Sequence, residues 1–176
     1  MAAKHQRQII REAIKATLLG KTAAGSRVYE TRLVPWRTQE LPAISVYAGD
    51  ESSDDRDTAP RELERTVDMT IDAVLFADVD VDDSLDAFAL EIERAMHADP
   101  TLGGAAGDST LISTTLGTMA EGNRPLGAIQ LVYRTTYYTY APDPADATLD
   151  DLNTINIQTR LNGDADPVED RIEFEE

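Results

Sequence analysis

The chain of 176 residues has no cysteine and only two histidines. The absence of cysteine excludes disulfides and thiolate metal sites, and the isolated His5 and His97 argue against an imidazole-rich metal site within one chain. No apolar run approaches the ~18 residues of a membrane-spanning helix. The first ten residues, MAAKHQRQII, lack the long apolar segment of a secretory signal. We therefore expect a cytoplasmic origin, no membrane partner and no cofactor.

Positive charge is scarce outside the N-terminal third of the chain. Residues 1–48 hold eight Lys or Arg and three Asp or Glu, a net charge of +5, which leaves −22 for residues 49–176. The total of −17 argues against sequence-independent nucleic-acid binding, because such binding requires cations to replace the counterions on phosphates. The asymmetry either serves solubility or gives neighbouring copies in an assembly complementary basic and acidic faces.

A strand followed by a helix organises the rest of the sequence. Apolar and polar residues alternate from Val67 to Leu75, which is typical of a half-buried strand. After an acidic turn the period changes, and residues 85–96 predict an amphipathic helix that folds back over the apolar side of the strand. Three residues can cap the first turn of this helix: Asp82, Asp83 and Ser84.

The remaining patterns complete a single domain. One helix is predicted over residues 4–19, and its row of cations is either a solvated face or a surface for an acidic partner. Strands are predicted over 27–33, 44–47, 110–119 and 126–140. The fold class is therefore α+β over residues 1–141: a four- to five-stranded, largely antiparallel sheet with both helices on one face. An acidic extension over residues 142–176 follows as an extended C-terminal arm.

Three segments are hard to explain in a monomer, and we predict that they contact other copies or partners. Residues 49–62 are polar and acidic, which predicts a long mobile loop that orders only against a neighbour. Trp36 beside Arg37 is either a binding anchor or a tryptophan that covers the end of the sheet. Ile155 and Ile157 belong to an isolated strand that would need to add to a sheet edge, of its own subunit or another. The candidate contact residues in the loop are Asp50, Glu51, Asp54, Asp55, Arg56 and Asp57.

The acids Asp78, Asp80 and Asp82 follow the central strand as D-x-D-x-D. They do not form a calcium loop, because Asp83 and Ala89 stand where such a loop needs Gly and Glu. Asp78 and Asp80 have the placement of a strand-end magnesium site for phosphoryl transfer, but no partner Lys or second acidic motif accompanies them. We expect no catalysis, and a magnesium-dependent phosphotransferase is the alternative from a different class.

Three stretches carry a resemblance to a known family: LPAISVY at residues 41–47, the long strand at 65–75, and DSLDAFALEIERAM at 83–96. In this order and spacing, residues 5–140 resemble the tail terminator family of long-tailed bacteriophages, of the lambda minor tail protein U type. The resemblance does not extend to the acidic segment after Pro142.

The resemblance implies a structural virion protein without catalysis. Such terminators form a six-subunit ring that caps the head-proximal end of the tail tube, stops tube polymerisation and offers a surface to the head-tail connector. A closed ring of this kind requires two unlike lateral edges in each subunit. The implied partners are other copies of the chain, the tail tube protein and the connector protein. Genomic DNA would slide through a negative lumen without specific binding. Another neck or tail-completion protein is the alternative within the virion.

Overall fold

The structure is a computed structural model that describes residues 4–32, 36–58, 61–76, 80–121, 124–140, 154–159 and 168–173. The chain divides into two units, Met1–Ala141 and Pro142–Glu176, which are described separately below. The larger unit contains two helices, α1 (Gln6–Leu18) and α2 (Val81–His97), the short 3-10 helix η1 (Thr38–Glu40), and strands β1 (Val28–Glu30), β2 (Ala43–Thr58), β3 (Arg61–Phe76), β4 (Asp108–Glu121) and β5 (Arg124–Tyr140).

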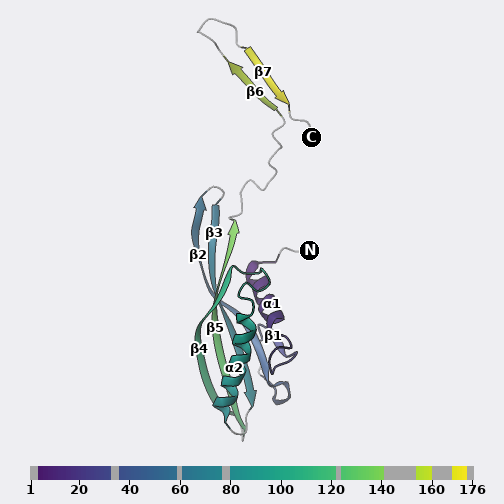
Figure 1. Cartoon of the computed structure of the whole chain (residues 1–176), viewed down its shortest axis with the longest axis vertical. Coiled ribbons are helices and arrows are strands. Elements are labelled where there is room, and N and C mark those ends of the chain that lie inside the picture. Colours follow the sequence, from purple (N-terminus) through teal and green to yellow (C-terminus); the bar gives the residue numbers. More distant parts are fainter. Residues whose placement is uncertain are drawn as a thin grey trace. The chain divides into compact units, whose positions relative to one another are not determined.

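The five strands form one mixed sheet in the order β1-β2-β3-β5-β4. β1 runs parallel to β2, and every other neighbouring pair is antiparallel. Figure 1 shows α1 and α2 against the same face of this sheet. The predicted fold class, a largely antiparallel α+β sheet with both helices on one face, is confirmed. No helix in the described ranges is long and apolar enough to cross a membrane.

One core lies between the helices and the sheet, because alternate residues of the central strands face the helices. Val67, Met69 and Ile71 of β3 are fully buried on this face, as the period-2 pattern predicted. The opposite face is polar, and register partners on it form hydrogen bonds, as between Asp72 and Gln130. The helices contribute residues spaced three or four apart: Ile10, Ile14 and Leu18 from α1, and Leu85, Phe88, Ile92 and Met96 from α2.

The sheet continues well beyond the helices. The prediction of a mobile loop over residues 49–62 is wrong, because β2 extends to Thr58 and pairs with β3 from Arg61 onward. The C-terminal end of β5 accompanies the first residues of β3, so three strands project past α1 (Figure 1). The acidic sequence has a low β-propensity, but it still forms a strand because the backbone N–H and C=O groups of β2 hydrogen-bond to those of β3.

The start of α2 also differs from the prediction. Asp80 is the N-cap residue, in the left-handed conformation at φ 55° and ψ 53°, and its side chain makes no capping hydrogen bond. The capping role predicted for Asp82, Asp83 or Ser84 is therefore wrong. Asp82 and Asp83 lie in the first turn, where their charges favour the positive end of the helix dipole.

The smaller unit contains two described strands, β6 (Thr154–Thr159) and β7 (Val168–Glu173). They pair antiparallel, with Ile155 opposite Ile172 and Ile157 opposite Asp170. The prediction that Ile155 and Ile157 belong to an isolated strand is wrong, because their partner strand lies within the same extension. The residues of β7 are mostly charged, so the sequence did not predict a strand there.

Candidate assembly surfaces

A β-bulge in β2 decides which way its acidic residues point. The register shifts between Ala48, which pairs with Met69, and Glu51, which pairs with Val67. One extra residue on β2 therefore reverses the alternation, and Glu51 faces the helix-covered side of the sheet. A Cβ at Gly49 would lie 3.0 Å from a carbonyl oxygen of β3, so the close approach of the two strands favours glycine here.

Glu51 is the centre of an ion-pair cluster in which its own carboxylate is the buried group. Its side chain is only 7% exposed, and its Oε2 lies 3.1 Å from Nε of Arg7 in α1. Its Oε1 pairs with Arg65 of β3, and the Arg65 guanidinium lies 5.8 Å from the centroid of the Tyr137 ring. The sequence predicted a position in an exposed loop, but the bulge turns Glu51 inward. The cluster joins the base of the projecting strands to α1, so the carboxylate of Glu51 is covered by residues of its own subunit.

Two tyrosines of β5 lie in the same buried layer. Burial raises the pKa of Tyr137 to about 12, and the negative charge of Glu51 adds to this shift. Burial also raises the pKa of Tyr133, with a smaller contribution from the charge of Glu93. Both hydroxyls are protonated at neutral pH, because ionising them would place a negative charge in a poorly solvated site.

Cross-strand charge pairs replace apolar contacts in the projecting part of the sheet. Asp55 accepts hydrogen bonds from Nε and Nη2 of Arg61 at 2.9 and 2.7 Å. These bonds hold the pKa of Asp55 below its usual range. Arg56 lies 3.4 Å from Glu62, and its guanidinium carbon is 4.5 Å from the centroid of the Tyr138 ring. The predicted contact residues Asp55 and Arg56 are therefore exposed but held in place by their neighbours.

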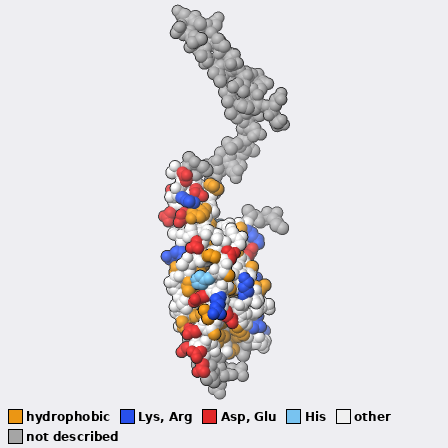
Figure 2. Space-filling model, viewed as in Figure 1, with side chains coloured by type: hydrophobic (Ala, Val, Ile, Leu, Met, Phe, Trp, Pro, Cys, Tyr) orange, Lys and Arg blue, Asp and Glu red, His pale blue; other side chains and the backbone are white. Residues whose placement is uncertain are grey.

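The other acidic candidates of β2 are also exposed: Asp50, Asp54 and Asp57. Asp50 borders a shallow depression on the helix-free face, beside the ion pair of Asp68 with Arg134. Figure 2 shows acidic, basic and hydrophobic side chains intermixed at the projecting end. This end offers polar contacts and exposed aromatic surface together, since Tyr140 is 68% exposed.

Trp36 is half-buried and is held by residues of its own subunit. The Arg32 guanidinium lies 4.3 Å from the centroid of the Trp36 ring and 5.2 Å from that of Tyr29. Arg32 also pairs with Glu40 at 2.6 Å. The neighbour named in the sequence prediction, Arg37, is exposed instead. Trp36 therefore packs against Tyr29 of β1, with the two ring centroids 5.6 Å apart. It makes its cation-π contact with Arg32, which follows β1, and keeps part of its surface accessible.

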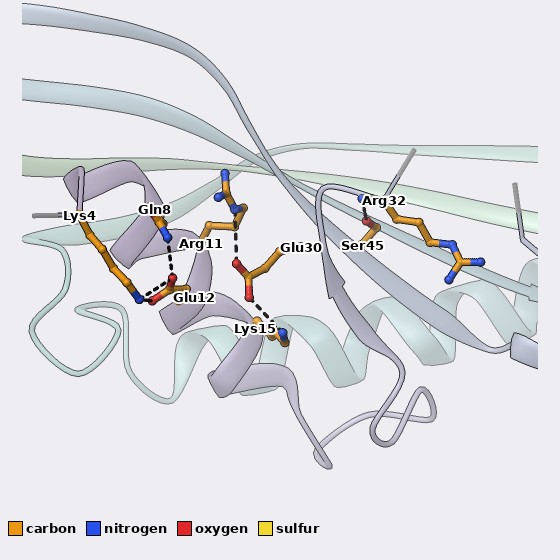
Figure 3. Close-up of polar contacts among 8 residues, drawn as sticks. All are labelled: Lys4, Gln8, Arg11, Glu12, Lys15, Glu30, Arg32 and Ser45. Atoms are coloured by element: carbon orange, nitrogen blue, oxygen red, sulfur yellow. Dashed lines mark hydrogen bonds and ion pairs between the residues drawn. The ribbon is translucent and has the colours of Figure 1, made fainter. Parts of the chain in front are cut away.

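The four cations of the predicted row, Lys4 and three residues of α1, all have acidic partners within the chain. Lys4 pairs with Glu12 at 2.8 Å, while Glu30 of β1 lies between Arg11 at 3.7 Å and Lys15 at 3.0 Å (Figure 3). The hydrogen bond from Lys4 lowers the pKa of Glu12. The fourth cation belongs to the Glu51 cluster described above. Three of these four cations therefore attach α1 to the sheet, and the row is not an unpaired strip for an acidic partner.

The described part of the acidic turn, from Asp80 onward, shows no arranged metal centre. Asp80 is exposed at the start of α2, and Asp78 lies outside the described residues. Within the described ranges, no group of three or more His, Cys, Asp or Glu side chains is placed to hold a metal ion. The magnesium-dependent alternative stays an untested prediction.

The sheet has two unlike open edges. β1 pairs only with Ile44, Ser45 and Val46, so no described strand covers the outer edge of β2 from Tyr47 to Thr58. β4 is the other edge and is fourteen residues long. Two large apolar side chains of β4, Ile112 and Leu116, are 42% and 46% exposed. The sequence predicted strand β4 but not that it lies at an edge.

Comparisons with known proteins add little to this geometry. No family model matches the sequence, and no curated protein matches it. Among solved structures, the chain is similar to one described as "Virion of native gene transfer agent (GTA) particle", at 16% identity and a TM-score of 0.36. The match covers 76% of this chain and 90% of that chain. A likeness at this level assigns neither a family nor a function.

Proposed function

We propose that the protein is a structural component of a phage-type virion, namely the tail terminator. In this role it forms a ring that caps the head-proximal end of the tail tube, stops tube polymerisation and joins the tail to the head connector. The sequence resemblance supports this, because its three stretches form the start of β2, most of β3 and α2. These elements are neighbours in one sheet-helix unit.

The observation that carries the proposal is the pair of unlike sheet edges. A closed ring of identical subunits needs heterologous contacts, in which one surface of each subunit meets a different surface of the next. A long edge at β4, uncharged from Ser109 to Ala120, and an acidic edge at β2 supply two such surfaces within one subunit.

The two ends of the larger unit also differ, as a ring between a tube and a connector requires. Helices cover one end of the sheet, and the projecting strands with their charge pairs form the other (Figure 1). The proposal assigns the tube protein and the connector protein to opposite ends. Genomic DNA passes through the lumen without specific binding, because the net charge of −17 repels phosphates.

The test combines native mass measurement with assembly of tail tubes. We expect a closed ring of six subunits, tubes capped at one end, and overlong tails when the gene is deleted. Tails of normal length without heads would favour another neck or tail-completion protein. A compact monomer at high concentration, with tubes that elongate unhindered, would overturn the proposal. Magnesium-dependent phosphoryl transfer abolished by Asp80→Asn would favour the enzymatic alternative.

A further inference from the structure

We propose that β4 of one copy binds the projecting part of β2 of a second copy, so that neighbouring subunits join by strand addition. The projecting part is defined as residues 47–58. This inference rests on the proposed ring and names the contact that closes it. The partner is thus a second copy of this chain, and the surface is the outer edge of β4.

β4 lacks most devices that keep an edge strand from pairing. Natural edges are short, or carry Lys, Pro or inward charges, or are covered by another element. β4 is fourteen residues long, and between Ser109 and Ala120 it has neither a charged residue nor a proline. Its single irregularity is a bulge between Leu111 and Ser113. Because Ile112 and Leu116 are also exposed over nearly half of their surface, a partner on this edge would cover apolar surface as well as backbone groups.

The projecting part of β2 is the matching edge. It spans twelve residues, close to the length of β4, and its outer backbone groups have no partner strand among the described residues. It is already ordered by β3 and by the pair of Asp55 with Arg61. Little conformational entropy is therefore lost when a second strand is added.

Charge selects between the possible edge pairings. Residues 47–58 contain five acids and one Arg, so pairing β2 with β2 would place like charges across the ladder, which is destabilising. The uncharged middle of β4 places no acid opposite them. β4 with β4 is also free of repulsion, but it would give a two-fold dimer and leave the acidic edges open.

Disulfide cross-linking tests this pairing directly, because the chain has no cysteine of its own. Ser52 and Ser53 of β2 and Ser113 and Thr115 of β4 are exposed. We combine one cysteine from each edge, in the four double variants that cover two neighbouring registers. At least one double variant is expected to give a ladder of oligomers after oxidation, and each single variant is expected to stay monomeric on a non-reducing gel.

The second experiment measures how a charge introduced on the β4 edge changes self-association. Leu116→Lys in β4 should weaken self-association by about tenfold or more. The change removes a leucine that the proposed contact would bury and places a charge in that contact. Leu90→Lys is the matched control, because Leu90 on α2 is equally exposed at 46%. It should leave association unchanged. Thermal unfolding of both variants confirms that each remains folded.

The outcomes separate this contact from the proposed function. A ring that caps tubes but gives no cross-link in any register overturns the β4–β2 contact and leaves the terminator role standing. Cross-linked ladders from a protein that does not cap tubes support the contact and count against the role. Dimers formed by Thr115→Cys alone, or equal effects of the two lysine variants, overturn the contact.

Discussion

The helix-covered half of the sheet and its projecting half share three strands, β2, β3 and β5, but are stabilised by different means. Under the helices, β3 presents Met69 and Ile71 to a continuous apolar core. Beyond α1, the same strand presents Arg65 and Glu62, whose partners are Glu51 and Arg56. The first half is stabilised by apolar burial, and the second by strand hydrogen bonds and charge pairs.

The difference shows that the covered half supplies most of the stabilising apolar burial, while the projecting half carries exposed polar side chains. Exposed ion pairs contribute little to stability, so the projecting half depends on the covered half to remain folded. The strand edges and side chains of the projecting half are accessible to solvent. The Glu51 cluster lies where the two halves meet, and there charge pairs around a buried carboxylate connect α1 to the sheet.

The largest expected effect on the free energy of unfolding comes from truncating an apolar side chain of β3, and we compare one such change in each half. Ile71 is fully buried, so Ile71→Ala should lower the free energy of unfolding by ~2–5 kcal/mol. Leu63→Ala removes the same number of carbon atoms from a half-buried position in the projecting half, and should cost about 1 kcal/mol, near the centre of measured point-mutant effects. Urea denaturation measures both, and equal losses would contradict the comparison.

A smaller effect is expected at the junction. Glu51→Gln keeps the shape of the side chain but leaves Arg7 and Arg65 without a negative partner, and should cost about 1–3 kcal/mol. Asp55→Asn is the control, because it also removes a carboxylate bonded to an arginine, but at a site where the side chain is 52% exposed. Its denaturation midpoint should be indistinguishable from that of the parent protein. A larger effect of Asp55→Asn than of Glu51→Gln would refute the assignment of Glu51 to the junction.

The smallest expected effect is on stability at alkaline pH, and it is absent at neutral pH. The pKa of Tyr137 is raised from 10.0 to about 12 in the folded chain. Its contribution to stability is therefore complete below pH 10 and is lost as the pH rises from 10 towards 12, because the unfolded chain ionises first. Tyr137→Phe should flatten the fall in stability over this range, whereas Tyr140→Phe, at a 68% exposed position, should not. Thermal unfolding at a series of alkaline pH values measures the difference.

Side-chain periodicity predicted most of the covered half and little of the projecting half. Alternation identified β3 around Ile71, and 3.6-residue spacing identified α2 around Phe88, because each segment must bury one continuous apolar side. The sequence from Gly49 to Thr58 has no such pattern, so it was assigned to a loop. Its strand conformation follows from pairing with β3, which local sequence does not encode.

The candidate contact surface was predicted only in part. Exposure of Asp54, Asp55 and Asp57 followed from composition, since clustered acids are rarely buried. The burial of Glu51 could not be predicted, because it depends on a one-residue bulge that reverses the side of the strand. Trp36 was recognised as unusual, but its contact with Arg32 and not with Arg37 depends on how the chain passes β1.

The sequence by itself determined the α+β class, both helices, the two central strands and the apolar face they share. These follow from periodicity, which is a local property that any burial of one face must satisfy. Only the tertiary structure decided the length of β2, the inward turn of Glu51, the pairing of β6 with β7 and the position of β4 at an edge. Each of these depends on which segment becomes a strand's neighbour, and hydrogen bonds between distant segments of the backbone carry no signature in the order of side chains.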